Sequence, residues 1–138
     1  MEKTLVLIKP DGVKKKIIGK IISMYEEKGL VIEQIKVLTP TEEVAKAHYG
    51  EFIEKPFFGE LIDFITSGKV VSMVISGEEA IKKVRKIHGA TNPLEAEMGS
   101  IRALYAESKS VNCVHASDSP DTAKREISLW FPSLGEEN

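Results

Sequence analysis

Three histidines, one cysteine and nineteen lysines and arginines carry most of the chemistry available to this 138-residue chain. His115 is distinctive because it ends a short apolar stretch and precedes a run of small and polar residues from Ala116 to Pro120. A neutral imidazole is a nucleophile near pH 7 when an acceptor holds its other ring nitrogen. His115 is therefore a candidate nucleophile, and the alternative is a strand-end histidine that bonds the following helix cap.

The other two histidines have simpler interpretations. His88 precedes Gly89 at the expected end of a helix, where a positive charge is favourable, so a structural role is expected. His48 ends a short expected helix beside Tyr49 and is equally compatible with a surface position.

Several motifs for phosphate, metal or nucleophile chemistry are absent from the sequence. No two glycines have the G-x-G spacing of dinucleotide sites, and no Gly-Lys pair is followed by the Ser or Thr of a Walker loop. One cysteine and three histidines offer no zinc-type spacing, and no G-x-S-x-G occurs. Any bound phosphate must therefore be held by side chains that converge on one cleft.

Length and composition predict one domain spanning residues 1–138, with 42% apolar and 29% charged residues. No apolar run approaches the roughly 20 residues of a membrane span, and no signal peptide is evident. A single cysteine excludes an intrachain disulfide and fits a reducing cytoplasm. The net charge of −2 gives no basic footprint for nucleic acid, so neither a membrane nor nucleic acid is expected as a partner.

Apolar periodicity predicts strands at residues 5–8, 30–38, 70–75 and 112–115, and helices between them. Thr39 is the expected cap of one helix, with Pro40 at its first position, and residues 76–79 form a second capping box. Residues 9–12 predict a turn, helices follow Gly12, Pro56 and Ser119, and residues 90–111 form a long connection with one short helical turn.

This order predicts an α+β fold of the ferredoxin-like βαββαβ type. In that arrangement two split β-α-β units interleave into one four-stranded antiparallel sheet, with helices packed on one face. A flavodoxin-like parallel sheet is the alternative, although four strands at this spacing suit it less well.

Residues 112–119, Asn-Cys-Val-His-Ala-Ser-Asp-Ser, resemble the N-x-x-H-[GA]-S-D-S active-site signature of nucleoside diphosphate kinases. Other segments match that family in the same order along essentially the entire chain: residues 9–12, 55–58, 67–68, 89–93 and 99–102. The resemblance implies the ferredoxin-like fold and transfer of a γ-phosphate between nucleotides through a phosphohistidine, with ping-pong kinetics and broad base tolerance. It also implies Mg²⁺ bound with the nucleotide and a homo-oligomer, either a tetramer or a hexamer built from dimers.

The resemblance assigns roles to ten residues. His115 is the nucleophile, and Glu126, Ser117 and Tyr49 support the site, Glu126 by holding the far ring nitrogen. The expected substrate-binding residues are Lys9, Phe57, Arg85, Thr91, Arg102 and Asn112. No protein metal ligand is expected, although Asp118 is a candidate for holding the water shell of the magnesium ion.

Some of these residues have alternative interpretations. Arg85 lies near a helix end where basic residues are favourable anyway, whereas the loop around Arg102 has no obvious structural need for it. Phe57 lies at the edge of an apolar stripe, and Glu126 is compatible with a solvated helix surface. The sequence also departs from the family pattern at Lys69, Met98, Ala103-Leu104 and Lys109, the last where an apolar residue often covers the base.

Two other classes of function remain open on the sequence. One is a non-catalytic regulatory module of ferredoxin-like fold that binds a small ligand. The other is a phosphate-relay protein in which a partner protein phosphorylates His115.

Overall fold

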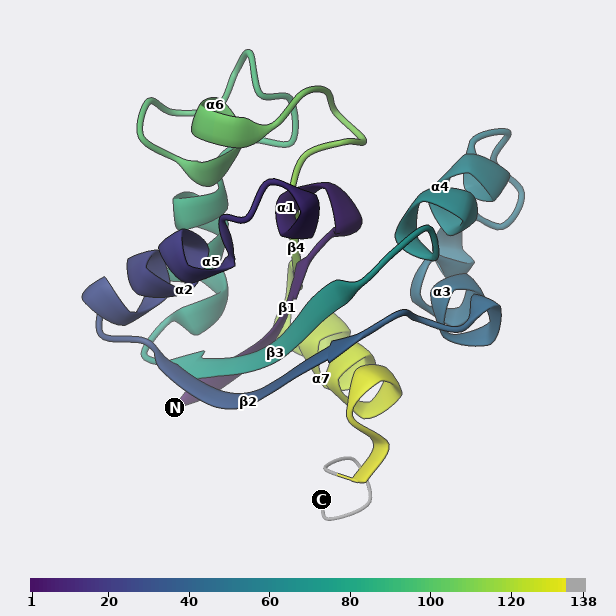
Figure 1. Ribbon diagram of the computed structural model, residues 1–138. Helices are drawn as coiled ribbons and strands as arrows, with labels where there is room; N and C mark the ends of the chain where they lie inside the picture. Colours follow the sequence, from purple (N-terminus) through teal and green to yellow (C-terminus); the bar gives the residue numbers. More distant parts are fainter. Residues whose placement is uncertain (134–138) are drawn as a thin grey trace.

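The computed structural model describes residues 1–133, and the last five residues of the expected domain, 134–138, lie outside the described part (Figure 1). Four strands form one antiparallel sheet in the order β2-β3-β1-β4. The strands are β1 (Glu2–Ile8), β2 (Val31–Leu38), β3 (Val70–Gly77) and β4 (Val114–Ala116). The four-stranded antiparallel prediction is confirmed, and the parallel alternative is wrong.

Within residues 1–133, eight helical segments connect and cover the strands. They are α1 (Pro10–Lys14), α2 (Ile18–Glu27), α3 (Glu42–His48), the 3₁₀ turn η1 (Gly50–Phe52), α4 (Phe58–Ile65), α5 (Ala80–His88), α6 (Ile101–Tyr105) and α7 (Pro120–Trp130). The turn expected at residues 9–12 is instead the start of α1, since Pro10 suits the first position of a helix. The long connection between α5 and β4 holds only α6, as expected.

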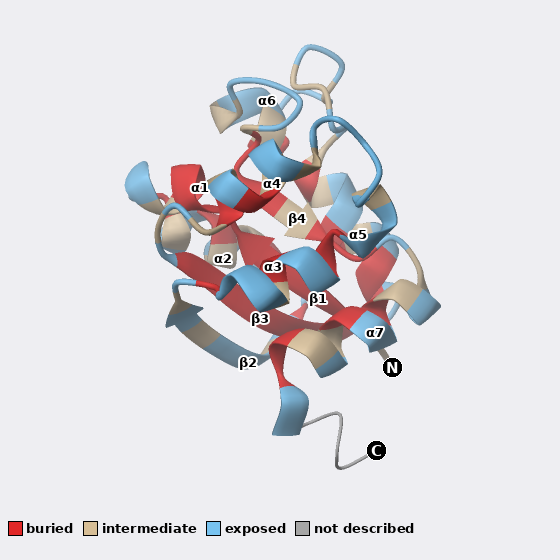
Figure 2. Cartoon of the chain, turned by 90° about the vertical axis from the view of Figure 1, so that its right-hand side faces the viewer, coloured by how far each residue is buried: buried red, intermediate tan, exposed pale blue. Residues whose placement is uncertain are grey.

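Helices cover both faces of the sheet, so the expectation of helices on one face is wrong. Alternate residues of β1 point to opposite sides: Val6 and Ile8 pack with α2 and α5, and Leu5 and Leu7 pack with α3, α4 and α7. Strand β3 is buried along its whole length (Figure 2). A strand that is apolar on both sides must be covered on both sides, as the run Leu5-Val6-Leu7-Ile8 already indicated.

Two expected helix caps lie elsewhere. Thr41, not Thr39, caps α3, because its Oγ1 accepts a hydrogen bond from the Val44 N–H at 3.1 Å, and Pro40 lies outside the helix. Ser76 remains in β3, where the ladder with β1 holds it opposite Lys3.

Helix α5 is therefore capped from a distant strand. Its preceding residue, Glu79, makes no side-chain cap. Instead, Glu2 Oε1 at the start of β1 accepts a hydrogen bond from the Ile81 N–H at 2.8 Å. Tertiary contact thus replaces the local capping box.

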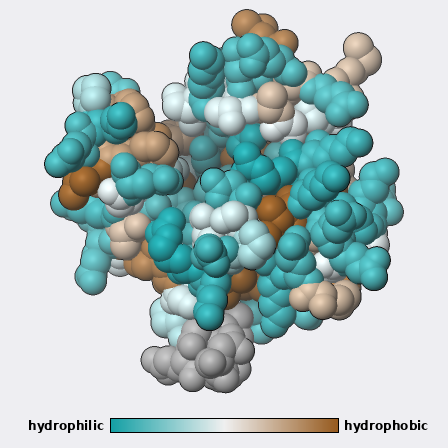
Figure 3. Space-filling view, turned by 180° about the vertical axis from the view of Figure 1, so that it is seen from behind, coloured by the Kyte–Doolittle hydropathy of each residue, from teal (hydrophilic) through white to brown (hydrophobic). Residues whose placement is uncertain are grey.

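The surface opposite the view of Figure 1 is mostly hydrophilic, with apolar side chains in small patches (Figure 3). Among residues 1–133, no helix has the length and apolar character needed to cross a membrane.

Candidate active site

A cavity of about 620 Å³ opens where the carboxyl end of β1 meets β4 and the helices α3 and α4. Strand β4 places His115 opposite Leu7, and Lys9 follows directly after β1. Nine of the ten sequence-predicted site residues line the cavity: Lys9, Tyr49, Phe57, Arg85, Thr91, Arg102, Asn112, His115 and Glu126. Ser117 is fully buried and reaches Glu126 from behind.

The imidazole of His115 is held through one of its two nitrogens. His115 Nε2 lies 3.0 Å from Glu126 Oε1, and the Ser117 hydroxyl donates to the same oxygen at 2.7 Å. The Glu126 side chain is 3% exposed, whereas the His115 side chain is 23% exposed. The geometry therefore leaves Nδ1 as the nitrogen available to a ligand, and it excludes a solvated position for Glu126.

Glu126 accepts these bonds as a carboxylate. Burial raises the pKa of Glu126, but the hydrogen bond from His115, the charges of both neighbouring histidines and the Ser117 hydroxyl lower it, and the net direction is downward. An ionised acceptor fixes the proton of His115 on Nε2. The lone pair of Nδ1 is then free for nucleophilic attack.

His48 is buried beside His115, so its surface interpretation is wrong. The Trp130 Nε1–H donates to His48 Nδ1 at 3.0 Å, and the two imidazole rings meet edge to face at 4.5 Å. Burial, helped by the nearby His115, lowers the pKa of His48 to about 3, so it is neutral. The sequence signal was available, because position 48 follows buried Ala45 by three residues on one face of α3.

His48, His115 and Glu126 also have the spacing of a metal site, with one ligand atom from each lying within 4.8 Å of the others. Hydrogen bonds engage potential ligand atoms of all three residues, however. Nδ1 of His48 accepts from Trp130, and Glu126 Oε1 accepts from Ser117 and His115. The group is therefore best described as a hydrogen-bonded network around one histidine.

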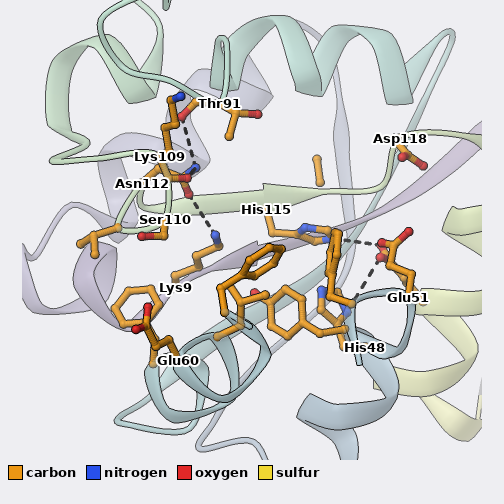
Figure 4. A pocket seen from close by; sticks show the side chains of 18 of the residues that line it. Lys9, His48, Glu51, Glu60, Thr91, Lys109, Ser110, Asn112, His115 and Asp118 are labelled. Atoms are coloured by element: carbon orange, nitrogen blue, oxygen red, sulfur yellow. Dashed lines mark hydrogen bonds and ion pairs between the residues drawn. The ribbon is translucent and has the colours of Figure 1, made fainter. Parts of the chain in front are cut away.

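Lys9 and Asn112 are joined on one wall of the cavity (Figure 4). Lys9 Nζ donates to Asn112 Oδ1 at 2.9 Å, and Asn112 Nδ2 donates to the Lys109 carbonyl at 2.8 Å. A longer contact of 3.4 Å joins Asn112 Nδ2 to the carbonyl of Thr91. Burial, with the charge of Arg102 second, lowers the pKa of Lys9 to about 8.

Arg102 has a structural role that the sequence did not indicate. Its guanidinium donates to the Gly89 carbonyl at 2.9 Å and to the Val114 carbonyl at 2.8 Å, so it joins the long connection to β4. Burial and the charge of Arg85 lower the pKa of Arg102 to about 10. Arg85 in turn reaches the carbonyl of Ala116 at 3.3 Å, which a simple helix-end cation would not do.

Aromatic side chains form the opposite end of the cavity. Phe57, immediately before α4, is 42% exposed, and its ring lies 5.6 Å from that of Phe52. Tyr49 is 8% exposed and packs edge to face on His48 at 4.8 Å. Burial, followed by the charge of Glu126, raises the pKa of Tyr49 to about 12, so its hydroxyl is neutral.

Comparison with known proteins agrees with this architecture. The sequence model of the family described as nucleoside diphosphate kinase matches residues 2–135. A nucleoside diphosphate kinase of Methanobrevibacter smithii is 53% identical over 131 residues, which cover 95% of this chain and 87% of the relative. One from Exiguobacterium sp. is 51% identical over 134 residues, covering 97% of this chain and 96% of the relative. The chain belongs to the nucleoside diphosphate kinase family.

Two solved structures extend the similarity to the fold of the kinase. The apo nucleoside diphosphate kinase of Encephalitozoon cuniculi, at 41% identity, superposes with a TM-score of 0.93 over 95% of this chain and 89% of the other. The Aquifex aeolicus nucleoside diphosphate kinase, at 42% identity, also gives 0.93 and covers 97% of each chain. The enzyme is thus a phosphotransferase that acts on nucleotides, with the predicted ferredoxin-like fold.

His88 has the structural role expected of it in the kinase, although not as a cation at a helix end. It is 1% exposed, and its Nε2 lies 2.6 Å from the Tyr25 hydroxyl. Burial, together with the charge of Arg102, lowers the pKa of His88 well below its ordinary value of 6.5.

Two buried neutral histidines predict a loss of stability in mild acid. The unfolded chain protonates His48 and His88 as the pH falls through 6.5, whereas the folded chain does not. The free energy of unfolding should therefore be fully retained above pH 6.5 and should fall by about 2 kcal/mol between pH 6 and pH 5. Urea unfolding across this range measures it. His48→Gln should reduce the slope by about half, and an unchanged free energy in the unsubstituted protein would contradict the assignment.

Proposed function

We propose that this kinase carries the γ-phosphoryl group of a nucleoside triphosphate to a nucleoside diphosphate on Nδ1 of His115. The observation that supports this role is the asymmetry of the His115 ring. Its Nε2 is held by buried Glu126 at 3.0 Å, while the rest of the ring borders a cavity that four lysine and arginine side chains also line. A nucleophile with a fixed tautomer faces the place where phosphate would bind.

In the first half-reaction, the Nδ1 lone pair attacks the γ-phosphorus of the triphosphate. A bond forms between nitrogen and phosphorus while the bond from the γ-phosphorus to the bridging oxygen breaks, and the diphosphate leaves with that electron pair. The positive charge that develops on the His115 ring is stabilised through Nε2–H by the Glu126 carboxylate. In the second half-reaction the terminal oxygen of another diphosphate attacks the same phosphorus, and Nδ1 regains its lone pair.

Side chains replace the missing Walker loop. Charge spreads over the moving phosphoryl oxygens in the transition state, so positioned cations lower its energy. Lys9, Arg85 and Arg102 supply these charges, and the lowered pKa values of Lys9 and Arg102 reflect first their burial and then the charge of a neighbouring arginine. Thr91 and Tyr49, which also line the cavity, would add hydroxyl groups along the phosphates, and Asn112 with Lys9 would reach the ribose.

The donor set of the cavity suits magnesium that arrives with the nucleotide. Mg²⁺ keeps most of its water and binds through few protein carboxylates, and Asp118 lines the cavity as an exposed acid. Asp118 would hold the water shell of the ion, whose charge neutralises the phosphate oxygens. The nucleotide phosphates would supply the direct ligands.

The buried ammonium of Lys9 predicts the alkaline limit of nucleotide binding. Because the pKa of Lys9 is lowered to about 8, Lys9 is charged below that pH and loses its charge as the pH rises through it. The value of kcat/KM, which reports the free enzyme, should therefore fall about tenfold per pH unit above pH 8. Steady-state rates from pH 7 to pH 10 measure this fall. Lys9→Met should be less active throughout and lack the fall, and a fall of equal size in that variant would exclude Lys9 as its cause.

We expect Phe57 to increase the affinity for nucleotides without distinguishing one base from another. An exposed ring can stack on any base, and stacking contributes about 1–3 kcal/mol. Phe57→Ala should raise KM about tenfold for adenine, guanine and pyrimidine diphosphates alike. Ile53→Ala, at a more exposed position that does not line the cavity, should leave KM unchanged. A tenfold change for one base only would mean that the residue reads the base.

Purified protein mixed with γ-labelled ATP tests the proposal against its rivals. The kinase should form an acid-labile, base-stable phosphoprotein that any added nucleoside diphosphate discharges. A regulatory module would bind nucleotide without retaining label, and a phosphate-relay protein would require its partner. Absence of label from purified protein and ATP would overturn the proposal.

We also expect a homo-oligomer built from dimers. Edge strand β2 leaves Val31, Ile35 and Val37 about half exposed, at 47%, 50% and 57%. An exposed apolar edge strand is costly for a lone protomer and suits pairing with a second copy. Light scattering on the protein as it elutes from a size-exclusion column distinguishes a tetramer from a hexamer. The reducing cytoplasm remains the location that we expect for this protein.

A further inference from the structure

Cys113, two residues before His115, has an unusual backbone for a buried residue. Its φ angle is +73°, and only Lys16 and Glu79 among the described non-glycine residues also have positive φ. Both of those are exposed, whereas Cys113 is completely buried. A non-glycine residue in this region is strained, and such strain persists only where the surroundings impose it.

The strained residue is the centre of a γ-turn. The Val114 N–H donates to the Asn112 carbonyl at 2.9 Å, two residues back, across a central residue of positive φ. This is the rare and strained form of the γ-turn. The turn separates Asn112, which contacts Lys9, from strand β4, which carries His115.

Two residues that follow β1, Lys9 and Asp11, form hydrogen bonds to the backbone of this turn. Asp11 Oδ2 accepts a hydrogen bond from the Cys113 N–H at 3.0 Å, and the Lys9 N–H donates to the Cys113 carbonyl at 2.8 Å. A side chain at Gly12 would come within 3.0 Å of that carbonyl oxygen and 2.8 Å of Ile8 Cγ2. Glycine therefore permits the close approach that the two hydrogen bonds require.

The Asp11 carboxylate has the Cys113 amide as its hydrogen-bond donor within residues 1–133. It is 8% exposed, and its second oxygen, Oδ1, has no hydrogen-bond partner within residues 1–133. Burying a carboxylate is unfavourable unless its hydrogen bonds compensate for the free energy of hydration that it loses. The bond to the Cys113 amide is the contact that accounts for its position.

We propose that Asp11 is a positioning residue for phosphoryl transfer, holding Cys113 in the γ-turn that sets Asn112 and His115 relative to Lys9. The inference rests on the proposed function of His115. Without this acceptor the turn would relax toward an ordinary backbone. Asn112 would then leave Lys9, and the His115 ring would lose its alignment with the phosphates.

Rescue by glycine separates positioning from general stability, because glycine adopts positive φ without strain. Asp11→Ala should slow single-turnover phosphorylation of His115 by ATP about tenfold. Asp11→Asn, which keeps an acceptor oxygen, should stay within about threefold of the unsubstituted enzyme. Adding Cys113→Gly to Asp11→Ala should restore most of the lost rate, because the turn then no longer needs to be held.

Leu30→Ala is the matched control for destabilisation. Leu30 is buried and precedes β2 at the other end of the sheet, so this variant should lower the melting temperature without slowing phosphorylation. The inference would be overturned if Asp11→Ala were phosphorylated as fast as the unsubstituted enzyme. It would also be overturned if adding Cys113→Gly did not restore the rate that Asp11→Ala loses. If the unsubstituted protein itself gains no label from ATP, the proposed function fails instead, so the two failures are distinguishable.

Discussion

His115→Ala should abolish the phosphoenzyme and lower kcat at least about 10⁴-fold, because the group that receives the phosphoryl is gone. His115 is partly exposed at the end of β4, so shortening it removes few packing contacts, and the fold should be retained. Labelling with γ-labelled ATP and steady-state assays with ADP as acceptor measure both effects. Nucleotide affinity should change much less than kcat, since Lys9, Arg102 and Phe57 remain in place.

His48→Gln is the matched control for the loss at His115. The glutamine oxygen can accept from Trp130 as His48 Nδ1 does, and the ring of His48 lies only 4.5 Å from that of His115. This variant should still form the phosphoenzyme. If His115→Ala retained label while His48→Gln lost it, the nucleophile would be the other histidine.

Glu126→Gln should lower the rate of phosphoenzyme formation about 10²-fold to 10³-fold, with little change in nucleotide affinity. Glutamine preserves the size of the side chain and can still accept from Ser117, but it lacks the negative charge that stabilises the His115 imidazolium. Its amide can also donate to Nε2, which moves the ring proton to Nδ1 and removes the nucleophilic lone pair. Rapid-quench measurements at saturating ATP report this step directly.

Asp121→Asn provides the control on the same helix. Asp121 lies in the exposed first turn of α7 and does not line the cavity, so the same loss of charge there should leave the rate unchanged. A rate near that of the unsubstituted enzyme in Glu126→Gln would show that the carboxylate does not stabilise the ring, and the assignment of its role would have to be withdrawn.

The fold was predictable wherever local pattern and tertiary structure agreed. The apolar runs of β1 and β3 and the Ser119-Pro120 start of α7 lie close to their predicted positions. The cap of α5 was not predictable, because Glu2 supplies it from 79 residues away. The covering of both sheet faces was missed, although four consecutive apolar residues in β1 already indicated it.

The site residues that belong to a sequence motif were predictable. Those whose role depends on contacts formed in the folded chain were less so. His115, Lys9 and Asn112 all line the cavity, as the family resemblance implied. His48 was missed although its spacing from Ala45 indicates a buried face of α3, and its hydrogen bond from Trp130 is formed only in the folded chain. The two carbonyls that Arg102 binds come from Gly89 and Val114, a juxtaposition that only the folded chain creates.

The position of the phosphoryl group on the imidazole ring tests the central claim most directly. The protein should be phosphorylated with ATP, digested completely under alkaline conditions and compared by chromatography with standards of both phosphohistidine isomers. Because Glu126 occupies Nε2 of His115, the account predicts the Nδ1 isomer, absent from His115→Ala. Recovery of the Nε2 isomer, or of label on any residue other than His115, would contradict it.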